Sequence, residues 1–183
     1  MLASLAPSRK DAACLIAIVG GGASGALMTA HRLKCAGDAV RLTLIEPGEQ
    51  IGRGLACATE NVSHRLNVRA SNMSAFADDP DHFWNWLRAN GHRGDDRFCF
   101  VPRLVYGRYL GALVEDRLRE PDPRRVRWLR EIVTGLSERD GSVILRFSGS
   151  ETAVFDMAVL CCGHEASETL DAPFVSPWED PRA

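Results

Sequence analysis

A run of glycines near the N-terminus, Gly20-Gly-Gly22-Ala23-Ser24-Gly25, has the residue types and spacing that hold a phosphate chain. In this G-x-G-x-x-G pattern the first glycine makes a tight turn and the second lets the backbone approach a pyrophosphate. The third lets a helix pack close to a strand. The helix that starts here would point its free N–H groups and positive dipole end at the phosphates. The hexapeptide alone is a weak signal, so the segments around it decide its meaning.

The elements on either side of this turn are those that a dinucleotide site requires. The apolar run 15–19 predicts a strand buried on both faces, and 23–35 has helical spacing that ends before Gly37. Residues 40–45 predict a second strand, so the segment forms one right-handed βαβ unit. Glu46 follows that strand, and its carboxylate can accept both hydroxyls of an adenosine ribose. A carboxylate there also disfavours the 2′-phosphate of NADP.

Two other interpretations of the same residues remain open. The glycines could have only a packing role, with Glu46 as a solvated strand end. A methyltransferase binds its nucleoside on a related strand, turn and helix, but its glycine loop has different spacing and lacks the third glycine. The coincidence of strand, turn, helix and acid favours the dinucleotide site.

Two later segments favour FAD over NAD. Gly52-Arg53-Gly54-Leu-Ala56 is a second glycine-bearing turn, with a cation near the expected ribose and pyrophosphate. The segment from Asp156 to Gly163 is an acid, an apolar strand and a glycine. It resembles the segment by which flavoproteins of the glutathione reductase type return to the cofactor domain after a β-meander. Cys161-Cys162 replace the Ala-Thr that is usual there.

From about Leu15 to Pro181 the chain more closely resembles FAD/NAD(P)-binding proteins that are distant relatives of flavin-dependent N-hydroxylating monooxygenases. The segments that carry the resemblance are the two glycine turns, His64-Arg-Leu-Asn-Val68, Asn72-Met-Ser-Ala-Phe76, Asp79-Pro80 with Phe83 and Trp86-Leu87, Phe100-Val-Pro-Arg103 with Tyr106-Gly107, and Gly163-His164.

The resemblance implies roles for individual residues. The first turn would hold the pyrophosphate through Gly20, Gly22, Ala23, Ser24 and Gly25, and Glu46 would bind the ribose. Arg53, Gly54 and Gly163 would lie close to the cofactor, and the backbone of Val133 would meet the adenine. Asn67 and Met73-Ser74 would approach the flavin.

The remaining pattern completes an α/β prediction. A helix is expected from Asp79-Pro80 to Asn90 and another over 104–120, followed by strands at 126–133, 143–147, 153–155 and 157–161, with a hairpin at Asp140-Gly141. We therefore expect a three-layer, Rossmann-like FAD/NAD(P)-binding domain with a parallel sheet, a β-meander and inserted helices. Residues 48–78 are aperiodic and are interpreted as a cofactor-lining loop. Residues 1–13 are expected to be a flexible tail, and 14–183 one domain.

Composition and charge limit the kinds of partner that the chain can bind. A net charge of -2 over 183 residues argues against a nucleic-acid binder, and no stretch reaches membrane-spanning length. A soluble, cytoplasmic protein is expected, with homo-oligomerisation left open. The six cysteines are expected to be reduced and mostly buried, and no Cys/His cluster has the spacing of a metal site. His64 and His164 are interpreted as loop histidines with satisfied hydrogen bonds, and Trp84, Trp86 and Trp128 as core or interface residues.

The function that follows is the FAD-binding portion of a flavin-dependent, NAD(P)H-linked oxidoreductase, with NAD as the alternative cofactor. The resemblance implies a longer protein, because a second glycine-rich turn for NAD(P)H would follow Trp178. Whether this chain is itself an enzyme is left open, and so are its catalytic residues and its small-molecule substrate. Two alternatives are a non-catalytic nucleotide-binding module and a cofactor-free truncated remnant that acts as an interaction protein.

Overall fold

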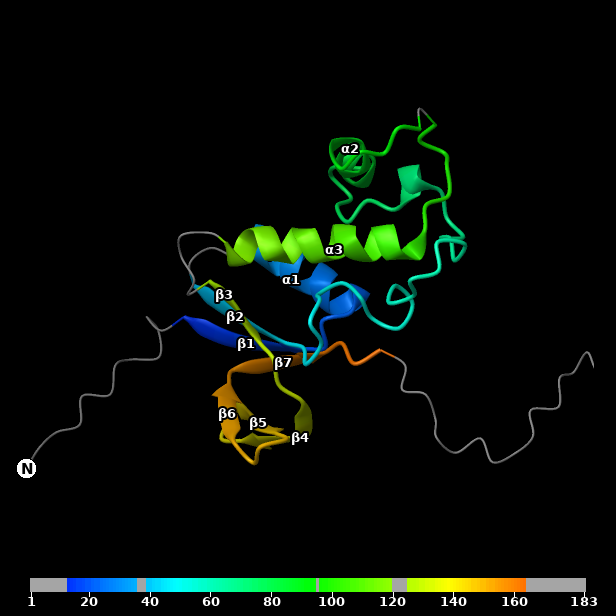
Figure 1. Cartoon of the computed structure of the whole chain (residues 1–183). Coiled ribbons are helices and arrows are strands. Elements are labelled where there is room, and N and C mark those ends of the chain that lie inside the picture. The colour runs from blue at the N-terminus through cyan, green and yellow to red at the C-terminus, as the bar shows by residue number, and fades with distance from the viewer. Residues whose placement is uncertain (1–12, 36–38, 95, 120–124, 164–183) are drawn as a thin grey trace, which may run out of the picture.

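The computed structural model describes residues 13–35, 39–94, 96–119 and 125–163 (Figure 1). The helices and strands run in the order β1 Cys14–Val19, α1 Ala23–Cys35, β2 Val40–Ile45, the 3₁₀ turn η1 Ala70–Asn72, α2 His82–Ala89, α3 Arg103–Leu118, β3 Val126–Leu129, β4 Val133–Arg139, β5 Ser142–Phe147, β6 Thr152–Phe155 and β7 Met157–Leu160. The strand β1, the helix α1 and the strand β2 match the predicted βαβ unit.

The strands form two sheets that differ in strand direction and in position. The first is a four-stranded sheet in the order β3-β2-β1-β7, in which β1 pairs in parallel with both β2 and β7. The second is the antiparallel sheet β4-β5-β6. Asp140 and Gly141 both have positive φ (53° and 72°) at the turn between β4 and β5, as a tight hairpin requires. The parallel sheet places the ends of three strands beside the glycine turn.

Alternate residues of β1 serve two cores, which is why this strand is apolar throughout. Ile16 and Ile18 pack into the larger core under the helices. Ala17 and Val19 face the other way and pack with Leu145 and other residues of the antiparallel sheet. Figure 1 shows the resulting layers, with α1 and α3 on one side of the parallel sheet and β4–β6 on the other. The predicted three-layer α/β fold is confirmed.

Two predicted boundaries are wrong. The expected strand 126–133 stops at Leu129 as β3, which pairs with β2; residues 130–132 belong to no strand, and β4 begins at Val133 in the other sheet. The helix expected from Asp79-Pro80 begins at His82 instead. The carbonyl of Phe76 accepts the Asp79 N–H in a turn, and Asp81 pairs with Arg97 rather than capping the helix. Residues 1–12 of the predicted tail 1–13, and His164, lie outside the described residues.

Candidate dinucleotide-binding site

The first and last glycines of the turn are required by close backbone contacts. Gly20 has φ +100°, and a Cβ atom there would lie 2.3 Å from the carbonyl oxygen of Cys161. A Cβ atom on Gly25 would lie 1.8 Å from the carbonyl oxygen of Gly20. Both distances are far below van der Waals contact. The turn therefore brings the N-terminus of α1 directly against the ends of β1 and β7.

The second glycine of the turn meets the second glycine-bearing loop. A Cβ atom on Gly22 would lie 3.3 Å from the Cα atom of Gly54, and one on Gly54 would lie 3.1 Å from the Cα atom of Gly22. The Gly52 N–H also donates to the carbonyl of Gly21 over 2.7 Å. Side chains at these positions would fill the space beside the α1 N-terminus. The arrangement fits a group that approaches backbone N–H groups closely, as a pyrophosphate does.

Glu46 joins the glycine turn to the residues that follow β2 through its carboxylate. Oε2 accepts the Gly21 N–H at 2.6 Å, and Oε1 accepts the Gly48 N–H at 2.8 Å. Its main-chain carbonyl accepts the indole N–H of Trp128 at 2.9 Å, which fixes the end of β2 against β3. A carboxylate oxygen has two lone pairs, so each oxygen can still accept one ribose hydroxyl. The residue thus shapes the glycine turn as well as offering acceptors to a sugar.

A cavity of about 500 Å³ opens over these loops. Its walls include most of the predicted cofactor residues, namely Gly20, Gly22, Ala23, Ser24, Glu46, Gly54 and Gly163. They come together because β1, β2 and β7 are parallel, so their carboxyl ends meet at one edge of the sheet. The structure shows that these residues lie close together. That they bind a cofactor stays a prediction.

Three of the residues predicted to bind the cofactor do not line this cavity, and neither do Asn67, Met73 and Ser74, which were expected to approach the flavin. Gly25 lies beneath the turn, against Gly20. Arg53 turns aside, donating to the side chain of Gln50 and to the carbonyl of Ala58, while its buried Nε has no hydrogen-bond partner in the described part of the chain. Val133 begins β4 and packs against the smaller core. Direct cofactor contacts from Arg53 and Val133 stay untested predictions.

Arg103 is a cavity residue to which sequence reasoning assigned no role. It is the first residue of α3, and its Nε donates to the carbonyl of Arg65. The available signal was its place directly after Pro102, where a helix begins. It borders the same cavity as Ala23 and Ser24 at the α1 N-terminus, so an anionic ligand there would lie near its positive charge. The other lining residues without a predicted role are Leu55, Ala56, Cys57, Cys161 and Cys162.

The cysteines are free, but the expectation that most are buried is wrong. Of the six thiols only Cys57 is buried, whereas Cys35 and Cys162 are exposed. Burial raises the pKa of the Cys57 thiol, while the guanidinium groups of Arg103 and Arg53 act in the opposite direction. Cys57 is therefore a neutral thiol at the cavity wall at neutral pH.

The other singled-out residues have structural partners. The Nδ1 atom of His64 lies 2.7 Å from the Thr59 hydroxyl, as expected for a satisfied loop histidine. Trp84, Trp86 and Trp128 pack against the larger core. Within the described ranges, no cluster of three or more His, Cys, Asp or Glu side chains is arranged to hold a metal ion. No helix in those ranges is both long and apolar enough to span a membrane.

Residues 17–165 match the model of a family described as FAD-NAD(P)-binding. The chain belongs to this family. The match covers the glycine turn, both sheets and the cavity, and it confirms the predicted cofactor class. A search of curated proteins finds no match.

Solved structures with the same fold are flavoproteins and related enzymes. The Diels–Alderase PyrE3 of pyrroindomycin biosynthesis is 21% identical with a TM-score of 0.55, over 81% of this chain and 32% of that one. OTEMO, crystallised with FAD and NADP, is 16% identical with a TM-score of 0.59, over 91% of this chain and 28% of the OTEMO chain. A variant of a flavin monooxygenase from Stenotrophomonas maltophilia is 13% identical with a TM-score of 0.53, over 81% of this chain and 38% of the monooxygenase chain. The chain thus spans about a third of the length of these structures.

Proposed function

We propose that the cavity binds FAD and that the chain is the FAD-binding portion of a flavin-dependent, NAD(P)H-linked oxidoreductase. The observation that carries this proposal is the contact between the two glycine loops, Gly22 against Gly54, beside the N-terminus of α1. Neither glycine places a side chain in the cavity there, so a phosphate chain can reach the N–H groups of the first helical turn.

Several features support FAD over NAD as the occupant. The second glycine loop and the segment Cys161–Gly163, which follows β7, both border the cavity, and both belong to the pattern that resembles flavoproteins. The carboxylate of Glu46 disfavours a 2′-phosphate, which argues against NADP in this cavity. The structural neighbour OTEMO was crystallised with FAD together with NADP.

The chain's own residues would bind and orient the cofactor. The N–H groups near Ala23 and Ser24 would donate to the pyrophosphate, Glu46 would accept the ribose hydroxyls, and Arg103 would offset the negative charge. Bound FAD supplies the hydride and electron transfer chemistry of such enzymes. The substrate would be a small molecule, and the six free thiols fit a cytoplasmic location.

The test is the visible absorption spectrum of the purified chain, before and after incubation with FAD and desalting. We expect a flavin spectrum that remains with the protein. Replacing Glu46 by Arg should weaken FAD binding by about 10- to 100-fold, because charge-assisted hydrogen bonds are lost. Glu138→Arg, which changes an exposed carboxylate on β4, is the matched control.

Titrations with NAD and ADP separate the alternatives. ADP should compete with FAD, since both carry the adenosine and phosphates that the cavity is expected to hold. A folded chain that binds NAD but refuses FAD would overturn the proposal in favour of an NAD-binding module. A folded chain that binds neither would leave the interaction-protein alternative. Bleaching of bound flavin by NAD(P)H would support oxidoreductase activity.

A further inference from the structure

A second cavity, of about 540 Å³, lies along the C-terminal half of α1 and shares no lining residue with the dinucleotide cavity. Three helices border it, and each contributes residues four apart, which lie on one helix face. The pairs are Ala30 and Lys34 of α1, His82 and Trp86 of α2, and Ala112 and Asp116 of α3. The small side chains of Ala30 and Ala112 leave the space open.

This cavity is separate from the expected pyrophosphate position. Lys34 lies eleven residues after Ala23 on the same helix, or about 16 Å along its axis. The glycine turn adjoins the N-terminal end of α1, and the second cavity adjoins the other end. A ligand here would therefore not be part of the dinucleotide.

His82 is held in one orientation by a buried tyrosine. Its Nδ1 atom lies 2.8 Å from the hydroxyl oxygen of Tyr109, which also accepts the Ala75 N–H at 3.0 Å. Tyr109 is 0% exposed. Donation of the hydroxyl proton to Nδ1 satisfies all three groups and leaves the ring proton on Nε2. In the opposite tautomer the hydroxyl would donate to the Ser74 side chain, which also contacts it and which already accepts the Phe76 N–H.

The Nε2 atom of His82 and the indole N–H of Trp86 are both open donors. Neither has a hydrogen-bond partner among the described residues, and neither is among the buried atoms that lack one, so both remain accessible. The two residues lie one turn apart on α2 and both border the cavity. Two N–H donors on one helix face suit a ligand with two neighbouring acceptor oxygens.

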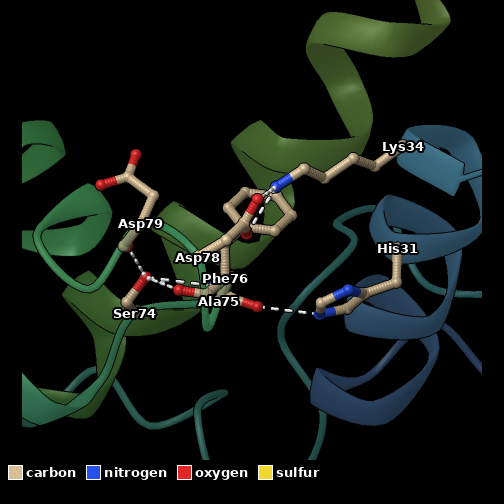
Figure 2. Close-up of polar contacts among 7 residues, drawn as sticks. All are labelled: His31, Lys34, Ser74, Ala75, Phe76, Asp78 and Asp79. Carbon is tan, nitrogen blue, oxygen red and sulfur yellow. Dashed lines mark hydrogen bonds and ion pairs between the residues drawn. The ribbon is translucent and has the colours of Figure 1, made fainter.

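Lys34 adds positive charge at the side of the cavity. Figure 2 shows its ammonium group above the Phe76 ring, beside the carboxylate of Asp78. The ammonium nitrogen lies 4.7 Å from the ring centroid. Figure 2 also shows His31, from the same helix, reaching the carbonyl of Ala75. These contacts hold the turn that carries Phe76 against α1.

The acidic groups lie on the solvent side of the cavity. The Asp116 side chain is 74% exposed and pairs with Arg119, and Asp79 is exposed as well. Figure 2 shows the Asp79 carboxylate pointing away from Lys34. Solvent screens such charges strongly, and the cations Lys34 and Arg117 border the same cavity, so the carboxylates repel a bound anion little.

We propose that this cavity is a second binding site, for a small monocarboxylate with a flat apolar body. The carboxylate accepts hydrogen bonds from Nε2 of His82 and the indole N–H of Trp86. The apolar body packs on the Trp86 ring, Leu113 and Ala112, which line the same space.

Benzoate is the probe that tests this site. We expect a saturable change in tryptophan fluorescence on titration with sodium benzoate at constant ionic strength, with a Kd on the order of 1 mM. Benzyl alcohol, which lacks the carboxylate, should bind at least about tenfold more weakly.

Two variants separate binding from folding. His82→Phe should weaken benzoate binding about tenfold, whereas the same change at His92, which lies outside this cavity, should leave it unchanged. Ala112→Leu fills the cavity without removing a donor, so it should abolish binding while the protein still unfolds at an unchanged or higher temperature. Dinucleotide binding should be unaffected by Ala112→Leu.

The proposal fails if fluorescence does not saturate at tens of millimolar benzoate. It also fails if Ala112→Leu binds benzoate as the unmodified chain does, or if benzyl alcohol binds equally well. Because FAD binding is measured separately by absorbance, failure here leaves the dinucleotide proposal standing, and the reverse also holds.

Discussion

The two ends of α1 are built on different principles. At its N-terminal end, backbone meets backbone, with Gly25 against Gly20 and Gly22 against Gly54. At its C-terminal end, long side chains reach outward, with His31 to the carbonyl of Ala75 and Lys34 to Asp78. Backbone contacts leave no room for adjustment, whereas flexible side chains can move by ångströms. Substitutions at the first end should therefore have far larger effects than those at the second.

The largest effect is expected for Gly25→Ala. The new Cβ atom would lie 1.8 Å from the carbonyl oxygen of Gly20, and Gly20 cannot retreat because it abuts Cys161. We expect a loss of at least about 4 kcal/mol of stability, or no folded protein, measured by urea unfolding. Gly149→Ala is the control, since a Cβ atom there has no neighbour within 4 Å. Its effect should stay within about 0.5 kcal/mol. Equal effects for the two variants would contradict the comparison.

An intermediate effect is expected from the tyrosines of α3, which packs against α1. The chain has two tyrosines, Tyr106 and Tyr109, and both are buried. Burial raises the pKa of Tyr106 to about 12 and also raises the pKa of Tyr109. The folded state therefore favours the protonated phenols. This stability is complete below about pH 10, the unfolded pKa, and is lost as pH rises toward 12.

The loss attributable to Tyr106 should be about 1.4 kcal/mol per pH unit within that window. Urea unfolding at pH 8, 10 and 11 measures it, with Tyr106→Phe as the control that should flatten the dependence. Absorbance at 295 nm, read together with circular dichroism, gives an independent check. Phenolate that forms near pH 10 while the protein stays fully folded would show that the tyrosines are not sequestered.

The smallest effect is expected for Lys34→Met, at the C-terminal end of α1. The hydrogen bond from Lys34 lowers the pKa of Asp78, so the pair acts only above the unfolded pKa of that carboxyl, near 4, and is lost as pH falls. The side chains are 40% and 71% exposed, so solvent and salt screen the pair. We expect a slight decrease in Tm at low salt, and none in 1 M salt, where the Debye length is about 3 Å. A large decrease that persists in 1 M salt would contradict this.

The N-terminal end of α1, where backbone packs against backbone, was predicted well from the sequence. Glycine spacing, the flanking strand and helix, and Glu46 have local causes, and the predicted α1 matches the structure residue for residue. Prediction was poorer where contacts with a distant element decide the secondary structure. The segment 126–133 is apolar enough for one strand, but 126–129 pair with β2 whereas Val133 starts a strand of the other sheet. Asp79-Pro80 has the residues of a helix start, yet Asp81 pairs with Arg97 and the helix begins later.

The sequence by itself determined the βαβ unit, the glycine turn and the acid at the end of β2, because these depend on residues close together in the chain. Only the tertiary structure decided that Arg103 faces the dinucleotide cavity while Arg53 turns to Gln50, and that His82 is oriented by Tyr109. The physical reason is that a side chain's partner comes from another element. Local spacing carries no information about which helix packs against it.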